Sequence, residues 1–449
     1  MVGMAGDSVS LKGSTTSLQN SEVGGSILPL DTSVLTAMAR TKKERLYLRD
    51  WLLIALMFLI NFEYFFVNVF GFDSIWKPYR IVAFIGALLV LPKLIGQREK
   101  YLGLMSPLLL SLACAIGLSL LLVAVEEADY DAVMHSLKLL SVGICLTLCA
   151  VAASMRAIRI GMFFLVLGLL VNLGYAWFIE SSDFYRETGF FRNPNHLGTA
   201  LGVACMYVVG IVSNRRQWLI VATLFILLAG IFLTGSRSAL FAVLLVVLMG
   251  AVRQPGARVA LVVLFLVGTL GYLSFGAELL EWLNSYQDGR LAYRFGISEI
   301  TRAGYRKELA VAGLNLGLET GFIGVGISQF ADFHYFYLVD SLGVLEDKYG
   351  HAVGIHNFYL ILLVEWGLAA TIFMVIFGKN LLTRTNRRKD DMGQFANRLI
   401  WMFVLVAATA DITAYVHFWV AIGIVIAIVN SKPVKSQKSR MPSPHAFTS

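Results

Sequence analysis

The chain has 449 residues, of which 57% are hydrophobic and only 15% are charged, whereas soluble proteins carry about 25% charged residues. This composition excludes an ordinary soluble domain and indicates an all-α polytopic membrane protein. The net charge of +8 fits Lys and Arg gathered in cytoplasmic loops, and so it does not indicate nucleic-acid binding.

The chain divides into a long apolar region between two polar tails. Residues 1–49 are rich in Ser, Gly and Thr, which predicts a disordered cytoplasmic tail. A transmembrane helical domain is expected over 50–430, and a basic cytoplasmic tail over 431–449. A span needs about 20 apolar residues. On this criterion the sequence predicts about twelve transmembrane helices, at 51–70, 79–97, 103–125, 133–154, 157–179, 195–213, 217–234, 238–252, 257–275, 356–378, 394–410 and 413–430.

The distribution of charge predicts how these spans are oriented. With the N-terminus inside, Lys and Arg fall mostly in alternate segments, most of them short, as the positive-inside rule requires. Both termini are then cytoplasmic. The large loop at 276–355, between spans 9 and 10, lies outside, and a loop of this length is typical of a functional region. Arg192, Arg237 and His356 are placed on the same outer face.

The first polar motif is the segment 189–198, Gly-Phe-Phe-Arg-Asn-Pro-Asn-His-Leu-Gly. Asn193 precedes a proline in a turn, and Asn195 is expected to cap the helix that follows. The free N–H groups of such a helix end suit an anion, and Arg192 can bind two phosphate oxygens. The alternative is a capped turn with an interfacial arginine.

The second motif is a polar turn between two apolar spans, Thr-Gly-Ser-Arg-Ser at 234–238. Gly235 permits the tight turn. Arg237 lies at the membrane boundary, where it either serves function or extends its side chain to the lipid headgroups.

The third motif lies in the long loop. Gly324-Val325-Gly326 predicts a tight turn before the aromatic-rich segment 327–338, which either floats at the membrane interface or stacks on sugar rings. A helix is expected over 307–317, with leucines 309 and 314 docking on the bundle. Arg306 opens this helix and is the preferred anion-binding residue of the loop, with Arg302 as a close alternative.

A histidine begins the apolar run after the loop. His356, followed by Asn357, changes protonation near neutral pH and is a candidate general base for a hydroxyl within about 3 Å. His351 competes for this role. Glu365 lies deeper in the predicted span. Such a buried acid has either a functional or a structural role, and we favour the structural one.

These motifs together resemble the bacterial O-antigen ligase and polymerase superfamily. Segments 191–198, 234–239 and 324–360 match in order over a core of roughly 180–370, followed by Glu-Trp-Gly at 365–367. The resemblance implies a GT-C-like helical fold and a glycosyltransferase that needs no metal or cofactor. Such enzymes take a glycan from undecaprenyl diphosphate at the periplasmic face of the inner membrane. Ligases pass it to lipid A-core, and polymerases pass it to another glycan repeat unit.

The resemblance also implies residue roles. Arg192, Arg237 and Arg306 match the family's arginines near the donor diphosphate, and His356 matches the histidine that activates the acceptor hydroxyl. Supporting roles fall to Asn193, Asn195, Arg302, Asn357 and Glu365. The ligase pattern of histidine, ten residues and glycine ends at Gly367. The small or hydroxylic residue expected three positions later is alanine here, with threonine adjacent, which weakens the case for a ligase over a polymerase.

Two other classes of protein remain open. A secondary transporter or flippase also has about twelve spans, but transporters usually show internal repeats and bind substrate near the midplane. No repeat relates 51–213 to 217–430, and the polar motifs gather at one predicted face. A sensor that uses the loop for docking is the third class. The sequence does not determine the sugar, the acceptor or the oligomeric state.

Overall fold

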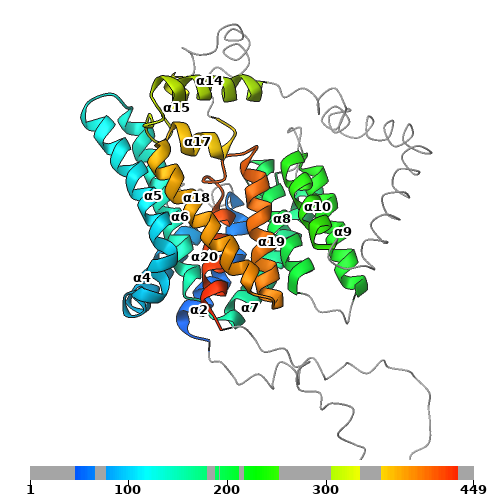
Figure 1. Ribbon diagram of the computed structural model, residues 1–449. Coiled ribbons are helices and arrows are strands. Elements are labelled where there is room, and N and C mark those ends of the chain that lie inside the picture. Colours follow the sequence, from blue (N-terminus) through cyan, green and yellow to red (C-terminus); the bar gives the residue numbers. More distant parts are fainter. Residues whose placement is uncertain are drawn as a thin grey trace, which may run out of the picture. The chain divides into compact units, whose positions relative to one another are not determined.

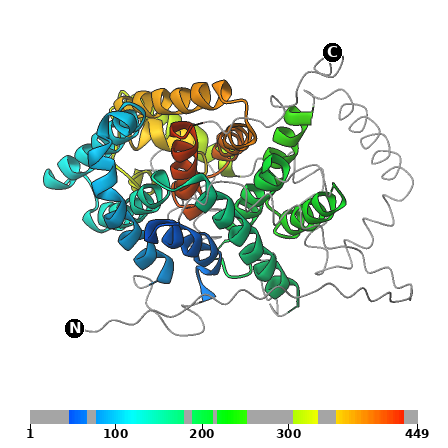
Figure 2. The same ribbon diagram turned by 90° about the horizontal axis from the view of Figure 1, so that it is seen from below.

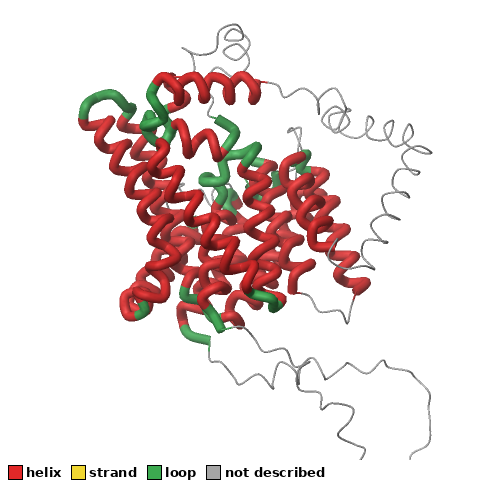
Figure 3. Tube along the Cα trace, viewed as in Figure 1, coloured by secondary structure: helices red, strands yellow, loops and turns green. Residues whose placement is uncertain are grey.

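The computed structural model describes most of the apolar region, and every regular element in the described part is helical (Figure 3). The two predicted tails fall almost entirely outside it, as do the ninth span and much of the long loop. Arg192, Arg302 and His351 also lie outside the described residues. The structure describes residues 46–65, 77–178, 188–191, 193–211, 217–251, 305–333 and 355–432.

The described helices follow the apolar runs of the sequence (Figure 1). They are α2 (Leu48–Leu59), η1 (Ile60–Phe62), α4 (Pro78–Gly96), α5 (Arg98–Ala124), α6 (Tyr130–Val151), α7 (Met155–Phe178), α8 (Pro194–Ile211), α9 (Gln217–Leu233), α10 (Arg237–Ala251), α14 (Tyr305–Glu319), α15 (Phe330–Phe333), α17 (Phe358–Val364), α18 (Gly367–Arg387), α19 (Asp391–Ala407) and α20 (Val416–Asn430). Five of them, α4, α5, α6, α7 and α18, are long and apolar enough to cross a membrane. The chain is therefore a helical multi-pass membrane protein, while the number of twelve spans stays a prediction.

The tenth predicted span, 356–378, is wrong in its position. The chain forms the short helix α17, breaks at Glu365 and Trp366, and continues as α18 to Arg387. Gly367 opens α18 with φ +84°, a conformation that favours glycine because it has no Cβ. An apolar run conceals such a break, since hydropathy does not record backbone angles. As a result, His356 precedes a separate short helix rather than a span.

The helices pack pairwise around α20. α5 runs along α18, α6 along α20, α2 along α7, and α8 contacts both α9 and α19. Nearly every residue of α20 from His417 to Ile428 is buried, as expected of a helix that is apolar on all sides. Figure 2 shows α20, in red, enclosed by the other helices.

Several helix ends meet on one side of the bundle through polar contacts. The Asp50 carboxylate at the start of α2 accepts the Ser154 N–H between α6 and α7 at 3.0 Å. The Lys93 ammonium near the end of α4 donates to the Ala152 carbonyl at 2.7 Å. These bonds place the ends of α4 and α6 beside the beginning of α2.

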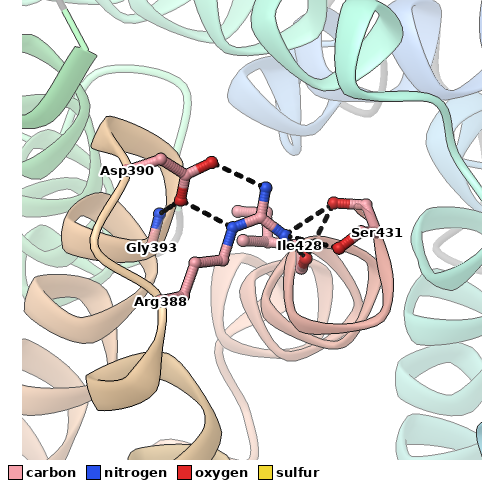
Figure 4. Close-up of polar contacts among 5 residues, drawn as sticks. All are labelled: Arg388, Asp390, Gly393, Ile428 and Ser431. Carbon is pink, nitrogen blue, oxygen red and sulfur yellow. Dashed lines mark hydrogen bonds and ion pairs between the residues drawn. The ribbon is translucent and has the colours of Figure 1, made fainter. Parts of the chain in front are cut away.

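Arg388 joins the α18–α19 turn to this same side. Its guanidinium binds both carboxylate oxygens of Asp390, at 2.6 and 2.8 Å, and donates to the carbonyls of Ile428 and Ser431 at the end of α20 (Figure 4). The planar guanidinium suits such a fork of contacts. We call this side the basic face, because the connections and helix ends there carry Lys93, Arg98, Lys100, Arg156, Arg384, Arg387, Arg388 and Lys389.

The opposite side carries the sequence motifs. The α5–α6 turn, the α9–α10 turn and the helices α14, α15 and α17 lie there (Figure 1). The α5–α6 turn is acidic, with Glu126, Glu127, Asp129 and Asp131. We call this side the motif face. Its assignment to the periplasm remains a prediction from charge.

Candidate active site

The first motif forms the beginning of α8. The Asn193 side-chain oxygen accepts the N–H of Asn195 at 2.8 Å, and its carbonyl accepts the N–H of His196 at 2.9 Å. Pro194 occupies the first helical position, where a missing N–H costs nothing. The prediction that Asn195 caps the helix is therefore wrong, because Asn193 performs this role two residues earlier. The helix end follows directly on Arg192 in the sequence.

The second motif packs directly against the first. Gly235 adopts φ +61° in the turn, the Thr234 hydroxyl accepts the Ser236 N–H at 3.2 Å, and α10 begins at Arg237. A Cβ on Gly198 of α8 would lie 2.6 Å from the Ser236 Cβ. The bare glycine thus allows the two motifs to touch. Arg237 is half-buried at this junction.

A buried amide holds the chain just before Arg192. The Asn172 side chain on α7 accepts the Phe190 N–H at 3.0 Å and donates to the Asn61 carbonyl at 2.7 Å. Gly189 turns there with φ +54°. A Cβ on it would lie 1.7 Å from the Asn172 side-chain oxygen. The Phe190 ring stacks on Tyr175 with centroids 4.2 Å apart.

This network of buried polar side chains extends to the central helix α20. Asn61 and His417 approach to 3.4 Å between side-chain oxygen and Nε2, and the Phe191 ring lies 5.5 Å from the His417 ring. Asn61 and Asn172 are fully buried. Sequence reasoning missed both asparagines, although a lone amide in an apolar run is a usable signal because buried polar groups need partners.

His356 lies in the turn just before α17. Asn357 caps this helix, since its side-chain oxygen accepts the N–H groups of Tyr359 and Leu360 at 3.0 and 3.2 Å. The Tyr359 hydroxyl donates to the Val404 carbonyl of α19 at 2.6 Å. The supporting role predicted for Asn357 is thus explained as capping, which fixes the backbone next to the histidine.

The structure brings Arg306 close to His356. Burial lowers the pKa of the His356 imidazole, and the positive charge of Arg306 lowers that pKa further. Arg306 is exposed in the first turn of α14. The helix predicted over 307–317 is confirmed and extends two residues further at each end. Its Leu309 is buried as predicted, but Leu314 is exposed and does not dock.

The glycine-rich turn docks on the break between α17 and α18. Val325 donates its N–H to the Val364 carbonyl at 3.0 Å, and Gly326 donates to the Glu365 carbonyl at 3.0 Å. Gly324 and Gly326 have φ of +107° and +97°, so the tight turn predicted there is confirmed.

The side chain of Glu365 stabilises the docked glycine-rich segment. Its carboxylate accepts the Ser328 N–H at 2.9 Å. Burial raises the pKa of Glu365 to about 8, while hydrogen bonds from the backbone N–H groups of Ser328 and Phe330 act in the opposite direction. These contacts support the structural role favoured for this acid. Phe330 is itself fully buried, so it neither floats at the interface nor stacks on a sugar, while residues 334–338 lie outside the described part.

Helix α5 and the turn that follows it hold the other side of the segment. The Ser119 hydroxyl accepts the Ile327 N–H at 2.9 Å. The Gln329 side chain accepts the Asp129 N–H at 2.8 Å. Sequence reasoning singled out neither Ser119 nor Gln329. Both are recognisable only once the helices that they join are known to be neighbours.

Thr371 bridges the helix break. Its hydroxyl lies 2.7 Å from the Leu362 carbonyl and 2.9 Å from the Gly367 carbonyl, so it stabilises a carbonyl that the break leaves without a helical partner. Ala370, at the position where the ligase pattern has a small or hydroxylic residue, is fully buried. The nearest hydroxyl is that of Thr371, one position after Ala370.

The site thus contains His356, with its lowered pKa, near Arg306. It also contains the junction of the first two motifs, at which Arg237 lies. Both parts are on the motif face. Among the described residues, no group of three or more His, Cys, Asp or Glu side chains is arranged to hold a metal ion. Anion binding and proton acceptance are the chemistry that these side chains offer.

Comparison with known proteins gives a family match over part of the chain. No curated protein sequence matches the chain. Residues 222–375, however, match the family described as O-antigen ligase. The matched segment includes the turn before Arg237, helix α14, the docked glycine-rich turn and His356, while the first motif lies outside it. This match over about a third of the chain supports the O-antigen ligase and polymerase superfamily for the protein.

Proposed function

We propose that the protein is a glycosyltransferase of the O-antigen ligase type. It moves an oligosaccharide or polysaccharide from undecaprenyl diphosphate onto a saccharide acceptor, such as lipid A-core, at the periplasmic face of the inner membrane. It does so without a metal ion and with inversion of the anomeric centre. The family match of residues 222–375 supports the general class, and the finer assignments are proposed from the residues of the site.

The pairing of His356 with Arg306 carries this proposal. A general base must be neutral at working pH, and both burial and the nearby guanidinium lower the pKa of His356. The capped turn before α17 fixes its backbone. Arg306 then serves twice, because it adds to the effect of burial in favouring the neutral imidazole and offers positive charge to the donor diphosphate.

The proposed reaction is a single displacement. The acceptor hydroxyl oxygen attacks the anomeric carbon and gives its proton to His356. The bond between that carbon and the phosphate oxygen breaks, and undecaprenyl diphosphate leaves with the electron pair. Its negative charge is stabilised by Arg192, Arg237 and Arg306, together with helix-end N–H groups. A diphosphate leaving group of this kind needs charge stabilisation more than protonation.

A repeat-unit polymerase is the second candidate. The chemistry is the same, and only the acceptor differs. Ala370 departs from the ligase pattern, and the nearby hydroxyl of Thr371 is engaged in bridging the helix break. This departure favours the polymerase.

The first experiment is deletion of the gene, followed by gel analysis of lipid A-core and of lipid-linked glycan. Bare core with lipid-linked polymer of normal length supports the ligase. Single repeat units alone support the polymerase. If the lipid-linked precursor instead stays on the cytoplasmic side, glycosyl transfer is refuted and a precursor transporter takes its place.

Replacement of the proposed base tests the mechanism directly. We expect His356→Ala to lower transfer about 100-fold or more, the usual contribution of general base catalysis, with unchanged insertion in the membrane. His135 is exposed on α6, and His135→Ala is the matched control that keeps full activity. Full activity of His356→Ala would refute the proposed base.

A further inference from the structure

An apolar groove lies between α4, α5, α6 and α20, and none of the proposed site residues lines it. Its volume is about 350 Å³, within the range of about 300–1,000 Å³ typical of ligand pockets. Tyr101, Met105 and Leu112 form its buried walls, and Leu102 and Leu109 are exposed along its rim. The groove is therefore deep, with an opening at the side of the bundle.

The groove exists because two consecutive helices diverge. α5 packs along α18, whereas α6 packs along α20, and the two make few contacts with one another. Trp419 of α20 closes the space between them. Its ring fits there because Gly143 on α6 has no side chain, and a Cβ at that position would lie 2.6 Å from the indole.

The walls suit hydrocarbon and offer nothing to a polar ligand. The Thr147 hydroxyl already donates to the Trp419 carbonyl at 3.0 Å, and the Trp419 indole N–H donates to the Thr413 carbonyl at 2.7 Å. Apart from Arg98, the remaining lining residues are aliphatic side chains, methionine and Tyr101. A hydrocarbon chain can fill this space and gain van der Waals contacts with the walls, without loss of hydrogen bonds.

One end of the groove carries positive charge. Arg98 lines the mouth at the basic face. The Lys100 ammonium lies nearby, 5.4 Å from the centre of the Tyr101 ring. An occupant with a hydrocarbon chain and an anionic head would therefore satisfy both parts of the groove. Basic residues beside a membrane attract anionic lipid in this way.

We propose that this groove binds one anionic phospholipid, with an acyl chain between α5 and α6 and the phosphate at Arg98. The lipid comes from the leaflet that meets the basic face. It fills the wedge that the diverging helices leave and so stabilises the α5–α18 pair, to which the docked glycine-rich turn is attached through Ser119. The proposal stands independently of the reaction that the protein catalyses.

The test uses the full chain purified in mild detergent, with bound lipids identified by mass spectrometry. Arg98→Gln removes the charge at the mouth, and Ile144→Trp fills the groove, which Ile144 lines. Two matched controls make the same changes elsewhere. Arg384→Gln alters an exposed basic residue on α18, and Val375→Trp enlarges an exposed apolar side chain on the same helix.

We expect about one anionic phospholipid per wild-type chain and the same in both controls. Arg98→Gln should lower its retention about fivefold, the effect of one basic residue at an anionic surface, and Ile144→Trp should abolish it. Added anionic lipid should raise the melting temperature of the wild type and not of Ile144→Trp, as linkage requires. Unchanged retention in both groove variants, or recovery of a polyprenyl lipid in place of the phospholipid, would overturn the proposal.

Discussion

At the scale of single residues, the protonation state of His356 depends on its surroundings. Burial and the charge of Arg306 act in the same direction, and both favour the neutral imidazole. A neutral histidine is the form that accepts a proton from an acceptor hydroxyl. Transfer should therefore fall as the pH decreases through the pKa of His356, which lies below that of an ordinary histidine.

Replacement of Arg306 tests this coupling. Arg306→Gln removes a positive charge near the imidazole, so the pKa of His356 rises and the acidic limb of the pH–activity profile moves to higher pH. The measurement is the rate of glycan transfer as a function of pH. Lys389→Gln, a neutralisation on the basic face, should leave the limb in place. An unmoved limb in Arg306→Gln, or one moved to lower pH, would show that Arg306 does not act on His356.

Residue chemistry was predictable from sequence where it depends on immediate neighbours. The sequence singled out His356 and Arg237, and it predicted a cap before α8, although the cap is Asn193 and not Asn195. Asn172 was not expected. Its role depends on the hydrogen bond that it accepts from the Phe190 N–H, at the end of the connection after α7. No local sequence pattern predicts this contact.

At the scale of elements, the break between α17 and α18 is the feature on which the site depends. Gly367 has φ +84°, and a Cβ there would lie 2.0 Å from the Ile323 carbonyl oxygen. The Leu368 N–H donates to the Phe322 carbonyl at 2.8 Å across the same contact. A side chain at this position would both strain the backbone and separate the docked segment from α18.

We therefore expect Gly367→Ala to lower the free energy of unfolding by about 1–3 kcal/mol, as a strained backbone position does, and to reduce transfer. Gly378 on the same helix provides a matched control, because a Cβ there meets nothing within 4 Å. Gly378→Ala should keep or slightly raise stability. Thermal unfolding of the purified proteins measures both. Equal melting temperatures for the two variants would contradict the role assigned to the break.

The elements themselves were only partly predictable. The helix after Arg306 and the turn at Gly324–Gly326 follow from helical spacing and paired glycines, and both are confirmed. The continuous apolar run at 356–378 predicted a single span. Apart from Glu365 the run stays apolar across Trp366 and Gly367, and the left-handed backbone of Gly367 that marks the break cannot be read from hydropathy.

At the scale of the whole molecule, charge separates the two faces. Helix ends with Lys and Arg gather on the basic face, and the acidic α5–α6 turn lies with the motifs on the other. The positive-inside rule then predicts that the basic face is cytoplasmic. This asymmetry could be predicted from sequence because it requires only the order of the apolar runs.

Cysteine labelling in intact cells tests the orientation. The four native cysteines are first replaced by alanine, and single cysteines are then introduced as Glu126→Cys on the motif face and Lys389→Cys on the basic face. We expect a membrane-impermeant thiol reagent to label the first in cells with a permeabilised outer membrane, and the second only after lysis. The reverse pattern would place the proposed active site in the cytoplasm and refute the periplasmic reaction.

The docking of the glycine-rich turn has a consequence for how this chain tolerates change. Its bonds to Val364 and Glu365 run between main-chain groups, which every amino acid except proline supplies alike. The amino acid at Val325 can therefore be replaced by another of similar size, whereas the number of residues in the segment cannot change. One extra residue between Gly321 and Phe330 would shift every later N–H away from its acceptor. An engineer seeking a site for an epitope tag should avoid this decapeptide, however loop-like its sequence appears.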